Sequence, residues 1–400
     1  MHIGIDASRM AVAARTGTEH YTYELLAALA RRDRQRRYTL YCNQRLAALP
    51  PLSPNFALHR IPFPRLWTHA RLSAELLVHA PDVLFVPAHV LPLGAPLRRR
   101  TRSVVTVHDM GYLRFPEAHT PTQRLYLRLS TLWSARAATR LIAISQATRD
   151  DLVRFAGVPP EKIAVIHHGL SDRFRPVTDR TAIDRVLERY GIGDKQTGRP
   201  GDGCPPAPYF LYVGTIQPRK NLAPLIEAFA QLEARDWRLE ASDAVPTSSP
   251  QPPASSLRLV IAGKPGWLTE AIERRAAELG VADRVVFAGY VADDDLPALL
   301  SGALAFAFPS LYEGFGLPVL EAMACGAPVL ASNTSSLPEV AGDAALLVDP
   351  DDTAAIAGGL ARLAGDAALR ADLRARGLAR AATFTWDRCA EETLRVLCSE

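Results

Sequence analysis

Two carboxylates and two glycines make residues 310–321 the densest group of chemically capable side chains in the 400-residue sequence. The carboxylates are Glu313 and Glu321, and the glycines are Gly314 and Gly316. Glycine lets the backbone adopt left-handed turns and approach a ligand closely. Ionised carboxylates only accept hydrogen bonds, so the pair suits a ligand with several hydroxyl groups. The plain structural alternative is one helix-capping carboxylate and one surface glutamate.

A helix is expected to start directly after these glycines. Pro318 suits the first helical turn, which puts Glu313 in the preceding loop and Glu321 about one turn inside the helix. The amides around Phe315 and Leu317 lack helical partners at such a start and can hold an anion. The segment therefore predicts a site for a ligand that carries both hydroxyl groups and negative charge.

A second cluster places adjacent cations at another junction between a strand and a helix. Gly214 follows the apolar run 209–213, and Arg219 and Lys220 come shortly before a helical pattern. Arginine can hold an oxyanion with two parallel hydrogen bonds, and lysine acts as a point charge. An Arg-Lys pair alone is usually a solvated surface feature. Its position after a strand, in the same half of the chain as the glutamates, favours phosphate binding.

The first half of the chain offers two further candidates. His108, followed by Asp109, lies where the run 103–107 meets a loop, and it could donate a hydrogen bond to a substrate hydroxyl. Gly17 lies in a loop after the first expected strand, where a phosphate or an acceptor could approach. This loop lacks the G-x-G-x-x-G pattern of dinucleotide sites, which argues against a nicotinamide oxidoreductase.

Three consecutive aspartates, Asp293 to Asp295, superficially resemble a metal-binding D-x-D motif. They precede the helical pattern of residues 296–300, so we interpret them as helix-capping residues. The cations Arg219 and Lys220 could neutralise a phosphate without help. We therefore predict no metal site and no cofactor.

Short strands alternate with longer helices along the chain, which predicts an α/β protein with doubly wound parallel sheets. We expect a domain over 1–175, a linker or insertion over 176–208 with one short helix, a second domain over 209–384, and a C-terminal helix over 385–400 that could return to the first domain. Residues 245–256 are rich in Ser and Pro, which predicts a disordered loop.

Each candidate cluster follows a strand, where ligands bind in such sheets, so we expect one shared cleft. Expected strands are 2–6, 38–42, 83–86, 103–107, 141–144, 163–166, 209–213, 257–262, 284–288, 304–308, 328–331 and 346–348; expected helices are 19–31, 68–79, 121–138, 146–156, 181–190, 221–233, 268–279, 294–301, 317–325, 353–363, 366–382 and 387–398.

Composition and charge limit the partners. The chain is 48% hydrophobic and 22% charged, as in soluble globular proteins, and no apolar run approaches the length of a membrane span. Its start lacks the features of a signal peptide, and its five cysteines form no C-x-x-C pair, so we expect reduced thiols in the cytoplasm. Residues 1–175 hold 25 Lys and Arg against 12 Asp and Glu, a net +13, whereas the remainder holds 21 against 30, a net −9.

The basic first half has arginine clusters over 31–37 and 98–102. Such clusters could attract phosphates or an anionic membrane surface, or they could form a solvated face. No aromatic-interleaved basic motif accompanies them, so we expect no nucleic-acid partner.

The motifs together resemble those of a known family. Residues 313–329 resemble the paired-glutamate motif of the retaining glycosyltransferases of family 4, also called glycosyl transferases group 1, which have the GT-B fold. Residues 213–221 resemble the family's diphosphate-binding segment, and His108 resembles its first-domain histidine. Residues 333–342 resemble the loop after the next strand. The resemblance covers nearly the whole chain.

This resemblance implies two Rossmann-like domains facing a cleft, and transfer of a hexose from a nucleotide-diphosphate sugar with retention of configuration. Arg219 and Lys220 would neutralise the diphosphate, Glu313 would hold sugar hydroxyls, Glu321 would hold the ribose, and His108 would contact the sugar near the reacting carbon. The implied donor-binding residues are Gly17, Gly214, Arg219, Lys220, Glu313, Gly314, Phe315, Gly316, Leu317 and Glu321.

The chain departs from the family in the first loop, where a glycine pair is common and Thr16-Gly17-Thr18 supplies one glycine. The motifs look most like those of bacterial mannosyltransferases of polysaccharide assembly. That likeness implies GDP-mannose as donor, a glycan or lipid-linked acceptor, and a cytoplasmic enzyme that could attach peripherally to the inner face of the membrane.

Two alternatives share the expected fold. A sugar-nucleotide epimerase would need acid–base groups in the cleft beyond His108, and we find none in the sequence. A non-catalytic sugar-binding homologue is disfavoured because Arg219, Lys220, Glu313 and Glu321 are all present.

Overall fold

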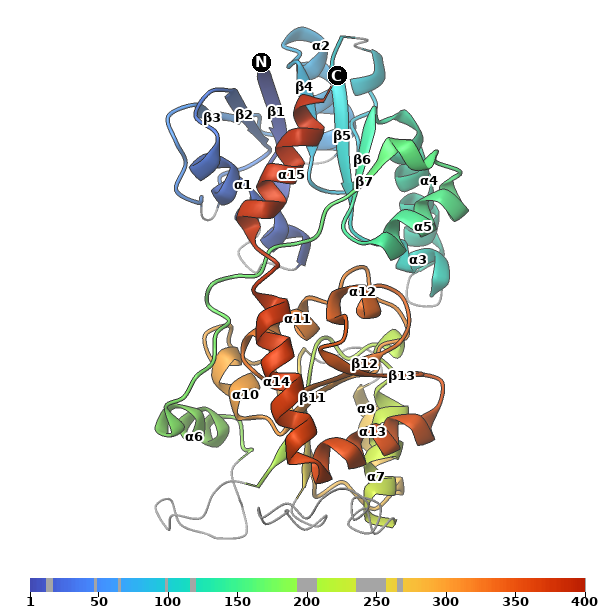
Figure 1. Ribbon diagram of the computed structural model, residues 1–400. Coiled ribbons are helices and arrows are strands. Elements are labelled where there is room, and N and C mark those ends of the chain that lie inside the picture. Colours follow the sequence, from blue (N-terminus) through green and yellow to red (C-terminus); the bar gives the residue numbers. More distant parts are fainter. Residues whose placement is uncertain are drawn as a thin grey trace. The chain divides into compact units, whose positions relative to one another are not determined.

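The chain forms two compact units in the computed structural model (Figure 1). Unit 1 comprises Met1–Ser171 and Phe384–Glu400, and unit 2 comprises Asp172–Thr383. The chain therefore leaves unit 1, builds unit 2, and returns. The structure describes residues 1–11, 17–46, 49–63, 66–97, 100–115, 120–192, 207–234, 257–264 and 269–399.

Unit 1 is built on a seven-stranded parallel sheet with the order β3-β2-β1-β4-β5-β6-β7. Most of its strands are buried along their length, as expected where helices cover both faces of a parallel sheet. Its strands are β1 (His2–Asp6), β2 (Arg37–Cys42), β3 (Phe56–Arg60), β4 (Val83–Val86), β5 (Arg102–Val107), β6 (Arg140–Ala143) and β7 (Ile163–Val165). Its helices are α1 (Gly17–Arg32), the π-helix η2 (Trp67–Leu72), α2 (Ser73–Val78), α3 (Gly111–Arg114), α4 (Pro121–Ala137), α5 (Gln146–Ala156) and α15 (Trp386–Cys398), with 3-10 turns at Ser8–Ala11, Ala95–Leu97 and Pro160–Lys162.

Helix α15 completes the core of unit 1 although it lies at the far end of the sequence. Trp386 and Leu397 belong to the same apolar cluster as Ile3, Ile5 and Leu25. Residues of α15 also pair with α1, beside which the helix runs in Figure 1. These ion pairs are Arg31 with Asp387 at 2.9 Å and Arg32 with Glu391 at 3.0 Å. Such exposed pairs contribute little, so burial of the apolar face of α15 is the main attachment.

Unit 2 is built on a six-stranded parallel sheet with the order β10-β9-β8-β11-β12-β13. Its strands are β8 (Tyr209–Val213), β9 (Arg258–Ala262), β10 (Val285–Gly289), β11 (Ala305–Phe308), β12 (Val329–Ser332) and β13 (Ala345–Val348). Its helices are α6 (Arg180–Arg189), α7 (Leu222–Ala234), α9 (Thr269–Glu278), α10 (Leu296–Gly302), α11 (Leu317–Ala324), α12 (Leu337–Ala341), α13 (Thr353–Gly365) and α14 (Ala367–Ala381), with a 3-10 turn at Pro218–Lys220.

Each sheet has one point where the chain reverses its direction of strand addition. In unit 1 this point lies between β1 and β4, and in unit 2 it lies between β8 and β11. Ligands of doubly wound folds bind beyond the carboxyl ends of the strands at such a point. The loops after β8 and β11 in unit 2, and after β1, β4 and β5 in unit 1, are therefore where a site is expected.

The predicted fold class is confirmed, and the expected strands and helices lie within about two residues of the observed ones. Strand β3 was not predicted. It is the sheet edge, and four of its five residues are exposed, so it lacks an apolar pattern. The short helices α3 and α12 were also not predicted. Ser145 caps α5 as expected by accepting a hydrogen bond from the amide of Thr148.

The range 176–208, expected to be a linker or insertion with one short helix, contains that helix as α6, which belongs to unit 2. Asp179 caps α6, and α6 packs against α10. Residues 193–206 and the predicted disordered loop 245–256 lie outside the described residues. Within the part of the chain that the structure describes, no helix is long and apolar enough to cross a bilayer.

Candidate active site

The paired-glutamate segment connects β11 to α11 in unit 2, beside the reversal point of the sheet. Gly316 has a φ of 104° and precedes the first residue of α11. A Cβ atom there would lie 2.6 Å from Cδ2 of Leu337, so both the backbone angle and the available space favour glycine. Glu313 lies in the loop, and Glu321 lies one turn inside α11.

Glu313 joins the two candidate clusters through a buried group of charges. Its Oε1 lies 2.5 Å from Nζ of Lys220, and its Oε2 lies 3.1 Å from Nη1 of Arg219. Arg219 also donates to the carbonyl oxygen of Tyr312 at 2.9 Å. Glu313 and Lys220 are both buried, with side chains less than a tenth exposed, while the Arg219 side chain is 26% exposed. The loop after β8 and the loop after β11 are thus held together by charge.

The cations decide the protonation of Glu313. Burial opposes ionisation, but the nearby charges of Lys220 and Arg219 outweigh it and lower the pKa of Glu313. Glu313 is therefore an anion between two cations. The Lys220 ammonium also lies 4.8 Å from the centre of the Phe308 ring, a favourable cation–π distance.

Two serines after β12 form hydrogen bonds with the backbone of this loop. Their segment, residues 333–342, was expected to matter only because of the family resemblance. Ser335 accepts a hydrogen bond from the amide of Glu313 at 3.0 Å. Ser336 lies 3.0 Å and 2.8 Å from the carbonyl oxygens of Glu313 and Phe315, to which it donates. The backbone around Glu313 is therefore fixed from the neighbouring strand.

Glu321 has the opposite electrostatic environment. Burial raises its pKa to about 7, the charge of Arg173 partly offsets this rise, and the charge of Asp293 adds to it. Arg173 is in turn paired with Asp293 at 3.0 Å. Glu321 therefore changes its charge near neutral pH.

The expectation that the aspartates cap a helix is wrong. Asp295 directly precedes α10, but its side chain makes no capping hydrogen bond. It instead accepts hydrogen bonds from Arg189 at 2.8 Å and 3.0 Å and from Tyr190 at 2.8 Å. Asp293 pairs with Arg173. Among the described residues, no group of three or more His, Cys, Asp or Glu side chains is arranged to hold a metal ion.

His108 lies directly after β5 in unit 1, and its tautomer follows from one hydrogen bond. Its Nε2 lies 2.8 Å from the carbonyl oxygen of Pro87, which can only accept. We therefore assign the proton to Nε2 and a lone pair to Nδ1. Burial and the neighbouring His89 lower the pKa of His108 to about 4, so the ring is neutral at physiological pH. His108 can accept a hydrogen bond through Nδ1, rather than donate one as the sequence suggested.

Further rings surround His108 that the sequence analysis missed. His89 follows β4 and His168 follows β7, so a search for histidines after strands would have found them. Ring centres of Tyr21, His89 and His168 lie 4.9, 5.5 and 5.7 Å from that of His108. Gly17 is exposed at the first turn of α1. Of the residues around it, Arg15 and Thr16 lie outside the described residues.

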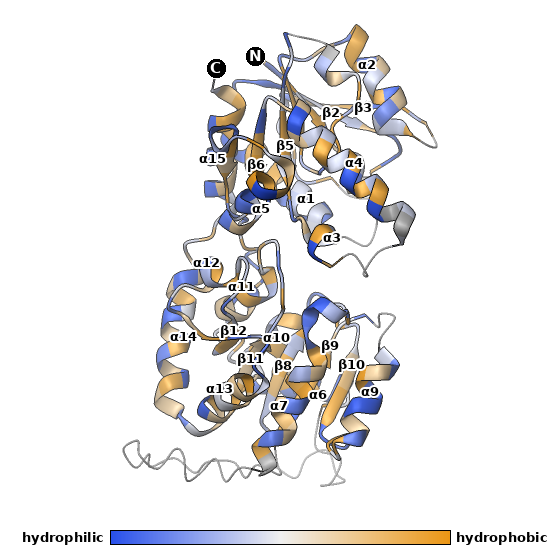
Figure 2. Ribbon diagram, turned by 90° about the vertical axis from the view of Figure 1, so that its right-hand side faces the viewer, coloured by the Kyte–Doolittle hydropathy of each residue, from blue (hydrophilic) through white to orange (hydrophobic). Residues whose placement is uncertain are grey.

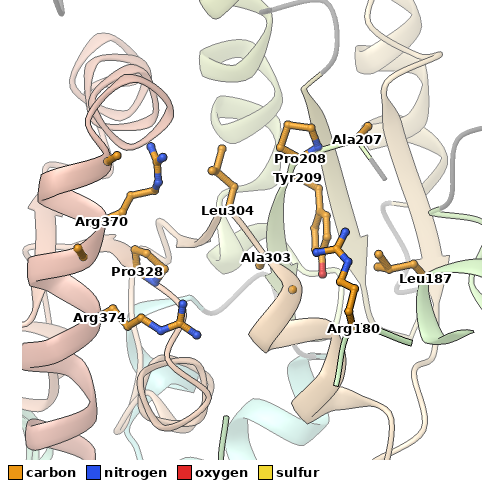
Figure 3. A pocket seen from close by; sticks show the side chains of 13 residues that line it. Arg180, Leu187, Ala207, Pro208, Tyr209, Ala303, Leu304, Pro328, Arg370 and Arg374 are labelled. Carbon is orange, nitrogen blue, oxygen red and sulfur yellow. The ribbon is translucent and has the colours of Figure 1, made fainter. Parts of the chain in front are cut away.

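Unit 2 also has a hollow of about 480 Å³ at the opposite, amino-terminal edge of its sheet (Figure 3). It lies at the start of β8 and before β11 and β12, and Arg180, Arg370 and Arg374 line it. Ligands of this fold class bind at the carboxyl ends of the strands, so this hollow is not the candidate active site.

Comparison with known proteins identifies the family. Residues 15–174 match the family model described as Glycosyltransferase Family 4, and residues 205–380 match that of Glycosyl transferases group 1. The chain is 34% identical over 331 residues to O-antigen chain mannosyltransferase B of Escherichia coli. This match covers 82% of this chain and 77% of that relative. The chain belongs to glycosyltransferase family 4.

A family 4 glycosyltransferase transfers a sugar from a nucleotide-sugar donor, so the predicted family and enzyme class are confirmed. The chain is also 33% identical over 292 residues to the serotype-specific mannosyltransferase WbdA of Escherichia coli, a match that covers 71% of this chain and 32% of that relative. Among solved structures it is similar to Anabaena Alr3699/HepE, crystallised with UDP and glucose, with a TM-score of 0.72, 20% identity and full coverage of both chains. This structural likeness shows the GT-B fold.

Substitution of the two cations should separate a catalytic effect from a structural one. We expect Arg219→Ala to lower the rate of sugar transfer about 100-fold or more while the unfolding temperature stays near that of the wild type. Lys220→Ala leaves the buried Glu313 carboxylate without its nearest partner and should also cost about 3–5 kcal/mol of unfolding free energy. Turnover assays and thermal unfolding measure the two effects. Arg275→Ala, which removes an ion-paired surface arginine of α9, is the control. Normal turnover by Arg219→Ala would contradict the assignment.

The raised pKa of Glu321 predicts a pH-dependent stability. The folded-state pKa of about 7 exceeds the ordinary 4.5, so the folded state holds this proton more tightly. The resulting stability is present in full below the ordinary pKa and is lost as the pH rises through 7. Glu321→Gln stays neutral at every pH. Between about pH 5 and about pH 8, the unfolding free energy of the wild type should therefore fall by about 2 kcal/mol relative to that of Glu321→Gln. Chemical denaturation at both values tests this, with Glu270→Gln, an exposed residue of α9, as control. Parallel pH curves for Glu321→Gln and wild type would refute the shift.

Proposed function

We propose that this glycosyltransferase moves mannose from GDP-mannose onto a glycan or lipid-linked acceptor in polysaccharide or glycoconjugate synthesis, with retention of the anomeric configuration. The mannose donor is supported by the likeness to two Escherichia coli mannosyltransferases, one of which matches 82% of this chain. Retention is supported by the paired-glutamate motif at Glu313 and Glu321. The enzyme would act in the cytoplasm, at the inner face of the membrane.

The buried cluster of Lys220, Glu313 and Arg219 carries this proposal. Negative charge grows on the diphosphate as the glycosidic bond breaks, and cations fixed in advance stabilise that charge more than they stabilise the ground state. Glu313 fixes both cations with hydrogen bonds of 2.5 Å and 3.1 Å. The start of α11, where Gly316 precedes the first helical turn, would add backbone amides.

Glu321 and His108 would bind hydroxyl groups. The carboxylate of Glu321 would accept hydrogen bonds from the ribose of the nucleotide, which requires its ionised form. His108 of unit 1 would accept a hydrogen bond from a hydroxyl of the donor sugar through Nδ1. Both roles come from the family resemblance, and for His108 the lone pair assigned to Nδ1 agrees with a hydroxyl donor.

The donor and the stereochemistry can be tested together. At a concentration about 100 times its Kd, GDP-mannose should stabilise the folded protein by about 2.7 kcal/mol, which a thermal shift assay detects. UDP-glucose is the matched comparison ligand. With an acceptor, NMR of the product should show the same anomeric configuration as the donor. Stabilisation by UDP-glucose alone would exclude mannose, and an inverted linkage would exclude retention.

We also propose that transfer needs no metal ion, because Arg219 and Lys220 supply the positive charge. Treatment with EDTA should then leave the transfer rate unchanged. Re-addition of manganese after chelation is the control, and it should have no effect. Activity that is abolished by EDTA and restored by manganese would show that a metal ion takes part.

A further inference from the structure

Unit 2 contains a cationic hollow that the proposed transfer reaction does not use. It lies at the amino-terminal edge of the sheet and measures about 480 Å³, a volume typical of small-molecule sites. Three arginines line it, Arg180 of α6 and Arg370 and Arg374 of α14. None of the described residues that line the hollow is acidic. The lining therefore suits an anionic ligand, because a guanidinium group binds two oxygens of a phosphate or carboxylate at once.

The hollow offers charge and apolar surface together. In Figure 3, Arg370 and Arg374 lie on one side of the view, and Arg180 lies on the other, near Tyr209. Apolar side chains complete the lining, namely Leu187, Pro208, Leu304 and Pro328. A bare anion would leave this apolar surface in contact with water, whereas a phosphate joined to a carbon skeleton would cover it. The lining therefore favours an organic phosphate.

Arg370 is held in place by the helix that precedes its own. Its Nη1 donates to the carbonyl oxygens of Leu363 and Ala364, near the end of α13, at 2.7 Å and 2.9 Å. Both bonds use one of the three guanidinium nitrogens, and the other two can donate to a ligand. Burial lowers the pKa of Arg370, and the charge of Asp366 partly offsets this effect. An anion in the hollow would compensate the same half-buried charge.

Arg374 forms no hydrogen bond or ion pair with another residue that the structure describes. Its helix α14 packs against α11, and Figure 2 shows hydrophilic turns of α14 alternating with apolar ones. Gly326 follows α11 with a φ of 76°. A Cβ atom at this position would lie 2.9 Å from Nε and 3.2 Å from Nη2 of Arg374. Glycine therefore leaves the space that this guanidinium group occupies.

Arg180 is the cation that the fold itself does not explain. The carboxyl-terminal ends of α13 and α11 favour positive charge at Arg370 and Arg374. Arg180, in contrast, is the first residue of α6, where the helix dipole disfavours a cation. Its ion pair with Asp184 at 3.0 Å is exposed and lies within one turn of the helix, so it contributes little. A ligand in the hollow would give this charge a partner.

The arginine clusters that the sequence suggested for phosphates are less suitable. Three arginines of the cluster over 31–37 form ion pairs with carboxylates of unit 1. In the cluster over 98–102, Arg102 donates to the carbonyl oxygen of Leu397 at 3.1 Å. Residues 98 and 99 lie outside the described residues. The charge of these clusters is thus used within unit 1, whereas the arginines of unit 2 surround a hollow.

We propose that the hollow of unit 2 is a second ligand site, separate from the donor site, and that it binds a small organic phosphate. The guanidinium groups of Arg180, Arg370 and Arg374 would hold the anionic oxygens, and the apolar lining would contact the carbon skeleton. The hollow lies at the edge of the sheet opposite the loops of Arg219 and Glu313, so both sites could be filled at once. The inference does not depend on the identity of the donor.

Calorimetric titration of the full chain with phenyl phosphate and with inorganic phosphate tests the proposal. Phenyl phosphate should bind more tightly, because its ring also covers apolar lining. Arg374→Gln removes a guanidinium group that has no structural bond to lose, and it should weaken binding of both probes about tenfold or more. Equal affinities for the two probes would exclude an organic ligand, and absence of binding by both would overturn the proposal.

A negative charge built into the hollow gives a matched test. Ala371 is exposed on α14 and lines the hollow, so Ala371→Glu should repel phenyl phosphate and weaken its binding about tenfold or more. Ala371→Gln has the same size without the charge and should bind almost as tightly as the wild type. Ala368→Glu makes the same change at an exposed residue of α14 outside the hollow and should bind like the wild type.

One further variant separates this site from the diphosphate cations. Arg219→Ala should keep the phenyl phosphate binding that Arg374→Gln loses. The opposite result would place the phosphate at the donor site and overturn the proposal, as would equal binding by Ala371→Glu and the wild type. Thermal unfolding of each variant confirms that it is folded. No nucleotide sugar is used in these titrations, so failure of the donor proposal would leave their result unchanged.

Discussion

One buried carboxylate, Glu313, joins the two loops that follow β8 and β11 in unit 2. Lys220 and Arg219 approach it from the loop after β8, and Glu313 itself comes from the loop after β11, 93 and 94 positions away in the sequence. Because β8 and β11 are neighbours at the reversal point of the sheet, the two loops must meet there. Neither Glu313 nor Lys220 could stay buried without the other, since an unpaired ion in the interior costs several kcal/mol. The contact that joins the two loops thus also fixes the positive charge that we propose for phosphate binding.

The two glutamates of the motif have identical side chains but different surroundings, because one lies in a loop and the other lies in a helix. Glu313, in the loop, is kept ionised by its cations, whereas Glu321, within α11, is pushed toward the neutral form by burial. Active sites commonly contain two carboxyl groups whose surroundings shift their pKa values in opposite directions. Here the first glutamate fixes two cations, and the second changes its charge near neutral pH. The serines after β12 fix the backbone around Glu313, so its carboxylate stays beside the two cations.

The sequence was sufficient for those features that depend on local pattern. Apolar runs and helix-start residues located β8, β11 and α11 and put Glu313 and Glu321 in a loop and a helix respectively. It was insufficient where a side chain's partner lies far along the chain. Asp295 looked like a helix cap because nothing nearby showed that Arg189 and Tyr190 would take its carboxylate. The tautomer of His108 depends on the carbonyl of Pro87, which only the sheet brings close. Strand β3 was not predicted because it is an exposed sheet edge and its sequence has no apolar alternation.

The return of the chain to unit 1 has a consequence for synthesis on the ribosome. The residues of unit 2 emerge in one continuous stretch, so that unit can close its core while translation continues. The sheet of unit 1 emerges earlier, but its core still lacks Trp386 and Leu397 until α15 has been made. Trp386 also packs against His168, in the ring cluster around His108. The unit translated first is therefore completed last, and a nascent chain without α15 exposes the apolar surface that this helix will cover.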